Sequence, residues 1–219
     1  MKTIIVIPAY NEEKTIGGVL RKLKDNGYKD IIVVDDGSKD KTFEIASNEK
    51  IKVFKHMINR GLGGALNTGI SAALKENADI IVTFDADGQH DFRDISKLNY
   101  YIEHGYDVAI GNRINEKMPF LRRIGNKGLD FVTYLLFGIY VNESQSGLRM
   151  FSRKAASLIE IKTNRMEVSS EIITEIGRHK LRLKEVPIRT IYTEYSLSKG
   201  NSVWNGFRIA FKLFLRRIM

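Results

Sequence analysis

Two aspartates separated by one residue, in Asp85-Ala86-Asp87, are the side chains best suited to bind a metal ion. They follow the apolar run 80–84, and residues two apart in an extended segment face the same side. Mg²⁺ and Mn²⁺ prefer oxygen ligands and readily bridge to a diphosphate. Asp87 and Gln89 can supply such oxygens, which leaves Asp85 for a ribose hydroxyl or the water molecules of the metal. His90 is expected to pack in the turn, with a role as a metal ligand as the alternative.

Two further polar segments each follow a β-branched run. Residues 8–13, Pro-Ala-Tyr-Asn-Glu-Glu, offer backbone amides, an aromatic face and a carboxylate to a nucleoside. The alternative is a strand exit in which Asn11 caps a helix. Residues 35–38, Asp-Asp-Gly-Ser, place a carboxylate where it can accept the ring N–H of uracil, or the N–H and amino group of guanine. Here the alternative is a plain Asp-Gly turn.

The elements that must position these residues alternate between strand and helix. Strand-like runs are predicted at 4–7, 31–34, 53–54 and 80–84, and helices at about 13–25, 41–48 and 62–75. Such alternation favours an α/β fold with a mostly parallel sheet flanked by helices. In these sheets a ligand binds beyond the carboxyl ends of the strands, where all three polar segments fall.

After Gly111 the sequence becomes richer in basic and aromatic residues, strands are expected to be scarce, and the helices look amphipathic. No linker, low-complexity tract or repeat interrupts the chain. We therefore expect one domain, residues 1–219, that divides near residue 112 into two halves and ends in an amphipathic, basic C-terminal lobe.

The composition narrows the chemistry further. The 219 residues contain no cysteine, which excludes disulfides, zinc–thiolate sites and cysteine nucleophiles. A net charge of +9 indicates a polyanionic partner, such as nucleic acid, anionic lipid or a phosphorylated substrate. No run approaches the roughly 18 apolar residues of a membrane span, and the N-terminus is interpreted as a first strand instead of a signal peptide.

Taken together, six stretches resemble family 2 glycosyltransferases of the GT-A (Rossmann-like) fold, and within them the dolichyl-phosphate mannose synthase-like group. The stretches are VIPAYNEE, VVDDGSKDKT, NRGLGGALNTG, FDADGQHD, AIGNR and SGLRMFSR. They occur in family order over roughly the first 155 residues, and the combination is specific although no single stretch is.

The resemblance implies a nucleotide-sugar-binding half (1–112), an acceptor- and membrane-facing half (113–219) and roles for individual positions. The nucleoside would be held by Pro8, Ala9, Tyr10, Glu12, Val34 and Asp36. The ribose and diphosphate would be held by Asp85, Ala86 and Asp87, with Asp87 and Gln89 on the metal. Arg113 would meet a donor phosphate, and Lys199 matches a lysine on a late loop that folds over the diphosphate. The glycine-rich segment 60–64 could cradle phosphate, but close packing is favoured because it lacks the lysine of a P-loop.

Glu143 departs from the family pattern, which usually has an aspartate four residues before the glycine that is Gly147 here. The longer side chain keeps the charge and shifts its reach. Asp85, Asp87 and Glu143 are the candidate catalytic residues, and Glu143 either acts on the acceptor or sugar or is a loop carboxylate paired with Arg149.

Two basic, apolar segments suggest a lipid. In the resembled group, the region from 118 to 141 receives a polyprenyl phosphate, which Arg122, Arg123 and Asn126 would meet; a core helix with solvated arginines is the alternative. The segment 196–219 has five basic residues and no acidic one, and its basic stripe beside an aromatic face is typical of a helix in a membrane interface. A calmodulin-target-like helix or a docked core helix shows the same pattern.

The sequence thus predicts an inverting, Mg- or Mn-dependent glycosyltransferase that moves a sugar from a UDP- or GDP-sugar to a polyprenyl phosphate. We expect it to be cytoplasmic and peripheral on an anionic membrane surface, without a transmembrane helix and without a nucleic-acid partner. The alternatives are a transferase acting on a hydroxyl of a soluble glycan, with Glu143 as general base, and a non-catalytic nucleotide- or RNA-binding module.

Overall fold

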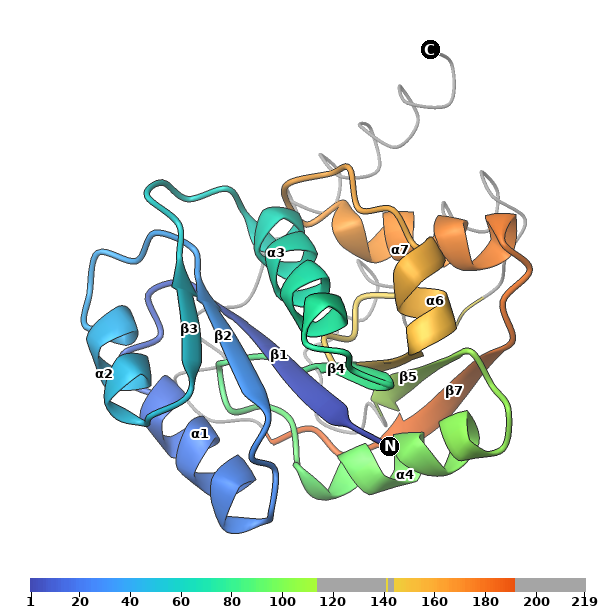
Figure 1. The fold of residues 1–219 in the computed structure, drawn as a ribbon, viewed down its shortest axis with the longest axis horizontal. Coiled ribbons are helices and arrows are strands. Elements are labelled where there is room, and N and C mark those ends of the chain that lie inside the picture. The colour runs from blue at the N-terminus through green and yellow to red at the C-terminus, as the bar shows by residue number, and fades with distance from the viewer. Residues whose placement is uncertain (114–140, 142–143, 192–219) are drawn as a thin grey trace, which may run out of the picture.

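A seven-stranded sheet forms the centre of the molecule (Figure 1). The structure is a computed structural model and describes residues 1–113, 141 and 144–191. The strands are β1 (Thr3–Ala9), β2 (Ile31–Asp35), β3 (Lys52–Lys55), β4 (Ile80–Thr83), β5 (Val108–Arg113), β6 (Arg149–Ser152) and β7 (Leu183–Ile188). Their order is β3-β2-β1-β4-β6-β5-β7, and only β6 runs antiparallel to its neighbours. The expected α/β fold with a mostly parallel sheet is confirmed.

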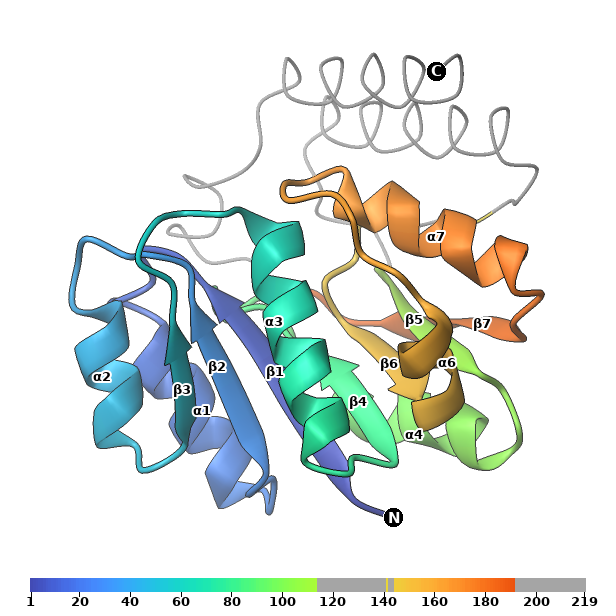
Figure 2. The ribbon, with the colours of Figure 1, turned by 45° about the horizontal axis from the view of Figure 1, so that its top comes forward.

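Helices cover both faces of the sheet. They are α1 (Ile16–Asp25), α2 (Thr42–Asn48), α3 (Leu62–Lys75), α4 (Arg93–Glu103), α6 (Arg153–Leu158) and α7 (Val168–Arg178). Figures 1 and 2 show α3, α6 and α7 together along one side of the sheet, where they enclose one hydrophobic core. Helices α1, α2 and α4 enclose a second core on the other face. No helix within the described residues combines the length and apolarity needed to cross a bilayer.

The central strands are apolar on both faces because both faces are covered. In β1, Ile4 and Val6 enter the core under α3, whereas Ile5 and Ile7 enter the opposite core. Strand β2 repeats this alternation from Ile31 to Val34. Burial on two sides therefore fixes which residues of each strand face which core.

Two details differ from the sequence-based expectation. Helix α1 begins at Ile16 and not at about residue 13, and the alternative in which Asn11 caps it does not hold, because the Asn11 side chain accepts the backbone N–H of Lys39 at 2.9 Å. Residues after Gly111 were expected to hold few strands, yet β6 and β7 complete the sheet beside β5. Strand β7 contains Pro187, which an edge strand tolerates because one side of its backbone needs no ladder partner.

Candidate functional site

The carboxyl ends of β1, β2 and β4 meet at one edge of the sheet, and two adjoining cavities lie there. Parallel pairing aligns Pro8 with Val34, and the backbone N–H of Asp36 donates to the carbonyl of Ala9 at 2.8 Å. A cavity of about 240 Å³ includes Glu12, Asp85, Asp87 and Gly147 in its lining. A second, of about 400 Å³, includes Ala9, Tyr10 and Asp36. Pro8, Leu62 and Met166 line both, so the two cavities form adjacent halves of one site.

Asp85 is held in a fixed place directly after β4. Its Oδ2 lies 3.0 Å from Nε2 of His90, and the His90 ring packs edge-on against Phe84 with 5.5 Å between ring centroids. His90 thus packs in the turn as expected. A Cβ placed on Gly147 would overlap the same Asp85 carboxylate. The carbonyl of Gly147 accepts a hydrogen bond of 2.8 Å from Thr83 Oγ1, which keeps this backbone against Asp85.

The charge of Asp85 is stabilised by its surroundings. Burial acts to raise the pKa of Asp85, but the hydrogen bond and charge of His90 act against it, followed by the charges of Arg113 and Arg149. Together they hold the pKa of Asp85 below its usual range. Asp85 is therefore an ionised carboxylate at neutral pH, and Arg113, at the end of β5, contributes positive charge to this half of the site.

The pKa of Asp87 is shifted in the opposite direction from that of Asp85. Burial and then the negative charge of Asp85 raise the pKa of Asp87 to about 6, with a smaller contribution from Glu12. Its two oxygens accept the backbone N–H of Gln89 at 2.9 Å and the Gln89 side-chain amide at 2.7 Å. The structure thus brings together the two residues predicted to bind metal, and the crowding of negative charge there favours a cation.

The donor set fits a hard divalent cation whose coordination is completed by oxygen atoms of a substrate. The oxygens of Asp85, Asp87 and Gln89 match the ligands that Mg²⁺ and Mn²⁺ prefer. Within the described residues, no cluster of three or more acidic, histidine or cysteine side chains forms a closed metal cage. Mg²⁺ usually binds through one or two carboxylates plus substrate phosphates, and this donor set is of that kind.

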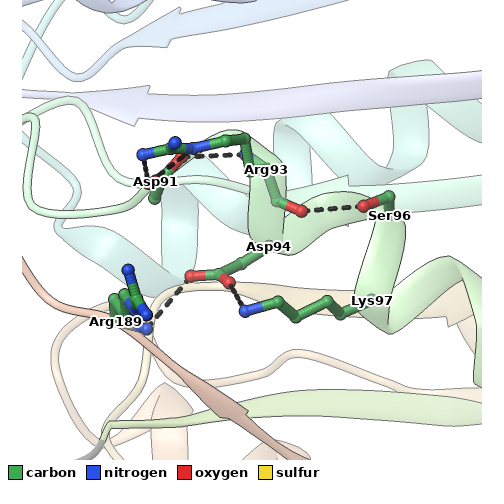
Figure 3. Close-up of polar contacts among 6 residues, drawn as sticks. All are labelled: Asp91, Arg93, Asp94, Ser96, Lys97 and Arg189. Atoms are coloured by element: carbon green, nitrogen blue, oxygen red, sulfur yellow. Dashed lines mark hydrogen bonds and ion pairs between the residues drawn. The ribbon is translucent and has the colours of Figure 1, made fainter.

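The loop that carries these aspartates is clamped by the end of β7. The N–H of Ile191 donates to the carbonyl of Gln89 at 2.8 Å, and His90 forms an isolated bridge with Thr190. Figure 3 shows the next contact, where the buried Asp94 at the start of α4 accepts the N–H of Arg189 at 3.1 Å and pairs with Lys97. The loop of Asp85, Asp87 and Gln89 is thereby held between β4 and α4 on one side and the residues that follow β7 on the other.

Asp36 in the second cavity is buried, with 3% of its surface exposed. Its carboxylate accepts the backbone N–H groups of Arg60 at 2.9 Å and Gly61 at 2.6 Å. Nδ1 of His56 lies 2.7 Å from Oδ1 of the same carboxylate. Tyr10, in contrast, is 42% exposed and its ring is accessible to a nucleoside. His56 escaped the sequence analysis because its partner lies twenty residues away in the chain.

The glycine-rich segment serves close packing, as favoured from the sequence. A Cβ on Gly61 or Gly63 would overlap the backbone carbonyls of residues 163 and 164. The Gly64 N–H donates to the Asn164 carbonyl at 3.2 Å. This contact carries Arg165 and Met166 into the lining of the Asp36 cavity. The sequence analysis missed both residues, because no local pattern links them to a segment a hundred positions earlier.

Several predicted site residues are not placed in these cavities. Val34 is fully buried in the core beneath α3, and neither cavity is lined by it. Glu143 and Lys199 lie outside the described residues, as do Arg122, Arg123, Asn126 and the basic C-terminal lobe. Their roles remain predictions.

The raised pKa of Asp87 leads to a stability prediction. Above pH 6 the folded, metal-free protein carries a disfavoured charge at Asp87 that the unfolded chain tolerates, so the wild type gains stability as pH falls from above 6 toward 4. We expect Asp87→Asn to have a higher Tm than wild type at pH 7.5 in EDTA, with the advantage shrinking at pH 5. Equal Tm values at both pH values would show that Asp87 carries no such cost.

Comparison with known proteins places the chain among sugar-transferring enzymes. The model of "Glycosyl transferase family 2" matches residues 4–166. An uncharacterised protein of Methanocaldococcus jannaschii is 55% identical over 98% of this chain and 91% of that protein. A UDP-N-acetylglucosamine–dolichyl-phosphate N-acetylglucosaminyltransferase of Methanococcus voltae is 41% identical over 98% of this chain and 95% of that enzyme. Among solved structures, glucosyl-3-phosphoglycerate synthase of Mycobacterium tuberculosis in complex with Mn²⁺ and UDP-glucose superposes with a TM-score of 0.74 at 18% identity. The match covers 99% of this chain and 78% of that one.

Proposed function

The chain belongs to glycosyltransferase family 2 and is a glycosyltransferase with the GT-A fold, and from this premise we propose that it transfers a sugar from a nucleotide-diphosphate sugar to a polyprenyl phosphate. The observation that supports a nucleotide-diphosphate sugar as the donor is the adjoining pair of cavities, one lined by Asp36 and Tyr10 and the other by Asp85 and Asp87. A polyprenyl phosphate as the acceptor is supported by relatives named for dolichyl phosphate, among them the M. voltae enzyme.

The two cavities suit the two ends of such a donor. The nucleoside would occupy the cavity of Tyr10 and Asp36, and the diphosphate would reach the cavity of Asp85 and Asp87 past Pro8 and Leu62. Asp87 and Gln89 would hold a divalent cation there, and that ion supplies Lewis-acid stabilisation of the leaving diphosphate. A metal in a similarly folded protein, the M. tuberculosis enzyme bound to Mn²⁺ and UDP-glucose, supports this assignment.

The residues of this chain contribute charge and position. Asp85, fixed by His90 and Gly147, orients the ribose or the metal's water molecules, and Arg113 meets a donor phosphate. The acceptor phosphate is already anionic at neutral pH and needs little deprotonation. Rate enhancement then comes mainly from holding the acceptor in line with the sugar. In well-oriented systems, such positioning lowers the activation barrier by roughly 7 kcal/mol or more, because the loss of entropy is avoided at the reacting step. Glu143 would orient the acceptor or the sugar.

An acceptor screen tests the proposal. Purified protein with Mn²⁺ and a panel of UDP- and GDP-sugars should release nucleoside diphosphate when a short-chain polyprenyl phosphate is added. Free sugars and oligosaccharides should leave release at background. If lipid phosphates were inert and hydroxyl acceptors reacted, the protein would be a glycan transferase, with Glu143 acting as general base and a matching limb in the pH–rate profile.

We further propose that the protein acts at the surface of an anionic membrane, on the side where the nucleotide sugar is present. Support comes from the sequence of the C-terminal segment, where Arg208, Lys212 and Arg216 recur every four residues beside Phe207, Phe211 and Phe214. Each basic residue near an anionic bilayer contributes about 1 kcal/mol, and salt weakens that attraction. Burial of the aromatic side adds a contribution that salt does not screen.

Liposome co-sedimentation should therefore show that wild type binds anionic vesicles more than neutral ones, and that high salt weakens binding without abolishing it. A chain truncated before Ser202 should lose most of this binding, and a carbonate wash should release the full-length protein. Equal binding of the truncated chain would exclude the C-terminal segment as the anchor.

A further inference from the structure

The Asp36 carboxylate is largely occupied before any ligand arrives. Oδ1 accepts the backbone N–H of Arg60 at 2.9 Å and lies 2.7 Å from Nδ1 of His56. Oδ2 accepts the backbone N–H of Gly61 at 2.6 Å. A carboxylate only accepts hydrogen bonds, so Nδ1 of His56 carries the proton in this contact. Three protein donors therefore hold one buried carboxylate that also lines the proposed nucleoside cavity.

His56 is itself held on its far side by α3. Its Nε2 lies 3.0 Å from Oγ1 of Thr68, which is also 3.0 Å from the carbonyl of Gly64 one helical turn earlier. The backbone N–H of His56 donates to the carbonyl of Asp35 at 2.9 Å. The His56 side chain is only 10% exposed. The ring is thus fixed at both nitrogens and through its backbone, and it cannot turn away from Asp36 without breaking these contacts.

The number of acceptor positions left on Asp36 matters for nucleobase recognition. A carboxylate offers about four lone-pair positions, and three are used here, two on Oδ1 and one on Oδ2. One position, on Oδ2, remains for a ligand. Uracil presents a single ring N–H. Guanine presents a ring N–H and an adjacent amino group, and cytosine has no ring N–H to donate. Leaving a buried donor unpaired is costly, so this edge suits uracil best.

We propose that His56 is a positioning residue that, by occupying Oδ1, commits Asp36 to a single-donor nucleobase and so makes the donor a uridine diphosphate sugar. This inference rests on the proposed function, in which Asp36 holds the nucleoside. Without His56, only the N–H groups of Arg60 and Gly61 hold the carboxylate, and a second acceptor position, on Oδ1, becomes available. Both the affinity for UDP and the preference over GDP then fall.

Equilibrium binding of UDP, GDP and CDP in the presence of Mn²⁺, by calorimetry on the full chain, tests the inference. Wild type should bind UDP at least about tenfold more tightly than GDP or CDP, because an unpaired or lost hydrogen bond to a charged group costs that much. His56→Ala should weaken UDP binding about tenfold and reduce the ratio of UDP to GDP affinity.

Two conservative variants separate positioning from a general loss of packing. An asparagine at position 56 can place its amide N–H where Nδ1 stood, whereas glutamine reaches only the position of Nε2. His56→Asn should therefore recover most of the UDP preference, and His56→Gln should behave like His56→Ala. Thr68→Val, which removes the far contact without touching Asp36, should reduce the preference by a smaller factor. His104→Ala serves as the matched control, because the exposed His104 contacts the carbonyl and the ring of Tyr100 and lines neither cavity.

The outcomes are distinguishable from those of the proposed function. If wild type bound no nucleoside diphosphate, both the proposed function and this inference would be overturned. If wild type bound GDP as tightly as UDP, or if His56→Ala kept both the affinity and the preference, only this inference would be overturned. Equal behaviour of His56→Asn and His56→Gln would likewise reject a role for Nδ1. Thermal unfolding of each variant verifies that it is folded before binding is measured.

Discussion

Replacing Asp87 with asparagine should reduce sugar transfer about a thousandfold, the upper range for removing one preorganised electrostatic group from an active site. The amide keeps the size of the side chain but removes the negative charge that would hold a divalent cation beside the donor diphosphate. The neighbouring negative charge of Asp85 and the contact with Gln89 cannot replace it. Initial rates of nucleoside diphosphate release at saturating Mn²⁺ measure the effect.

The same variant provides its own test of folding. Because we expect Asp87→Asn to be more stable than wild type at pH 7.5 without metal, a loss of activity cannot be attributed to unfolding. Addition of Mn²⁺ and UDP should raise the Tm of wild type and leave that of the variant nearly unchanged, since a ligand stabilises only the state that binds it. Asp25→Asn, at an exposed acid in the last turn of α1, is the matched control and should keep normal rates. Normal turnover by Asp87→Asn would remove Asp87 from the site.

The second large effect is expected at Gly147, which carries no functional group. A methyl group there would overlap the carboxylate of Asp85, which is also held by its contact with Nε2 of His90. In Gly147→Ala the carboxylate must leave its place, and a displacement of this kind costs about a hundredfold in rate. Strands β4 and β6 pair through Thr83 and Arg149 beside this point, so the sheet itself should remain intact.

Gly18→Ala is the control for this substitution, because a Cβ at Gly18 meets no atom within 4 Å. Alanine in the helix α1 should be neutral or slightly stabilising. Activity and far-UV circular dichroism of both variants decide the matter. If Gly147→Ala retained full activity, the present position of Asp85 would not matter for transfer.

The first half of the fold was predictable because its strands are buried on both faces. Long β-branched runs such as that ending at Val34 leave little choice of structure, and α3 begins and ends where the pattern predicted. Strand β6 is only four residues long and begins with Arg149, and β7 at the sheet edge contains Pro187 and lacks a regular alternation of polar and apolar residues. Neither carries a signal that distinguishes it from a loop, since its pairing partners decide its conformation.

The site was predictable to the extent that it is built from strand ends. The sequence placed Asp36, Asp85 and Asp87 at the same edge of the sheet, and the structure brings them to adjoining cavities. What could not be predicted depends on contacts distant in sequence. The occupation of Asp36 by His56 requires the turn after β3 to fold back. The entry of Met166 requires glycines near α3 to admit a backbone from before α7.

Strands β5 and β6 lie side by side and antiparallel, so the chain leaves the sheet after Arg113 and re-enters it at Arg149, with Ile110 aligned to Arg149. The two attachment points of that connection are therefore fixed as neighbours by the sheet. Lengthening or replacing a connection anchored in this way costs only a slowly growing closure entropy. In evolutionary terms, the chain between these two points can change in length and sequence while the sheet and its two cores are inherited unchanged.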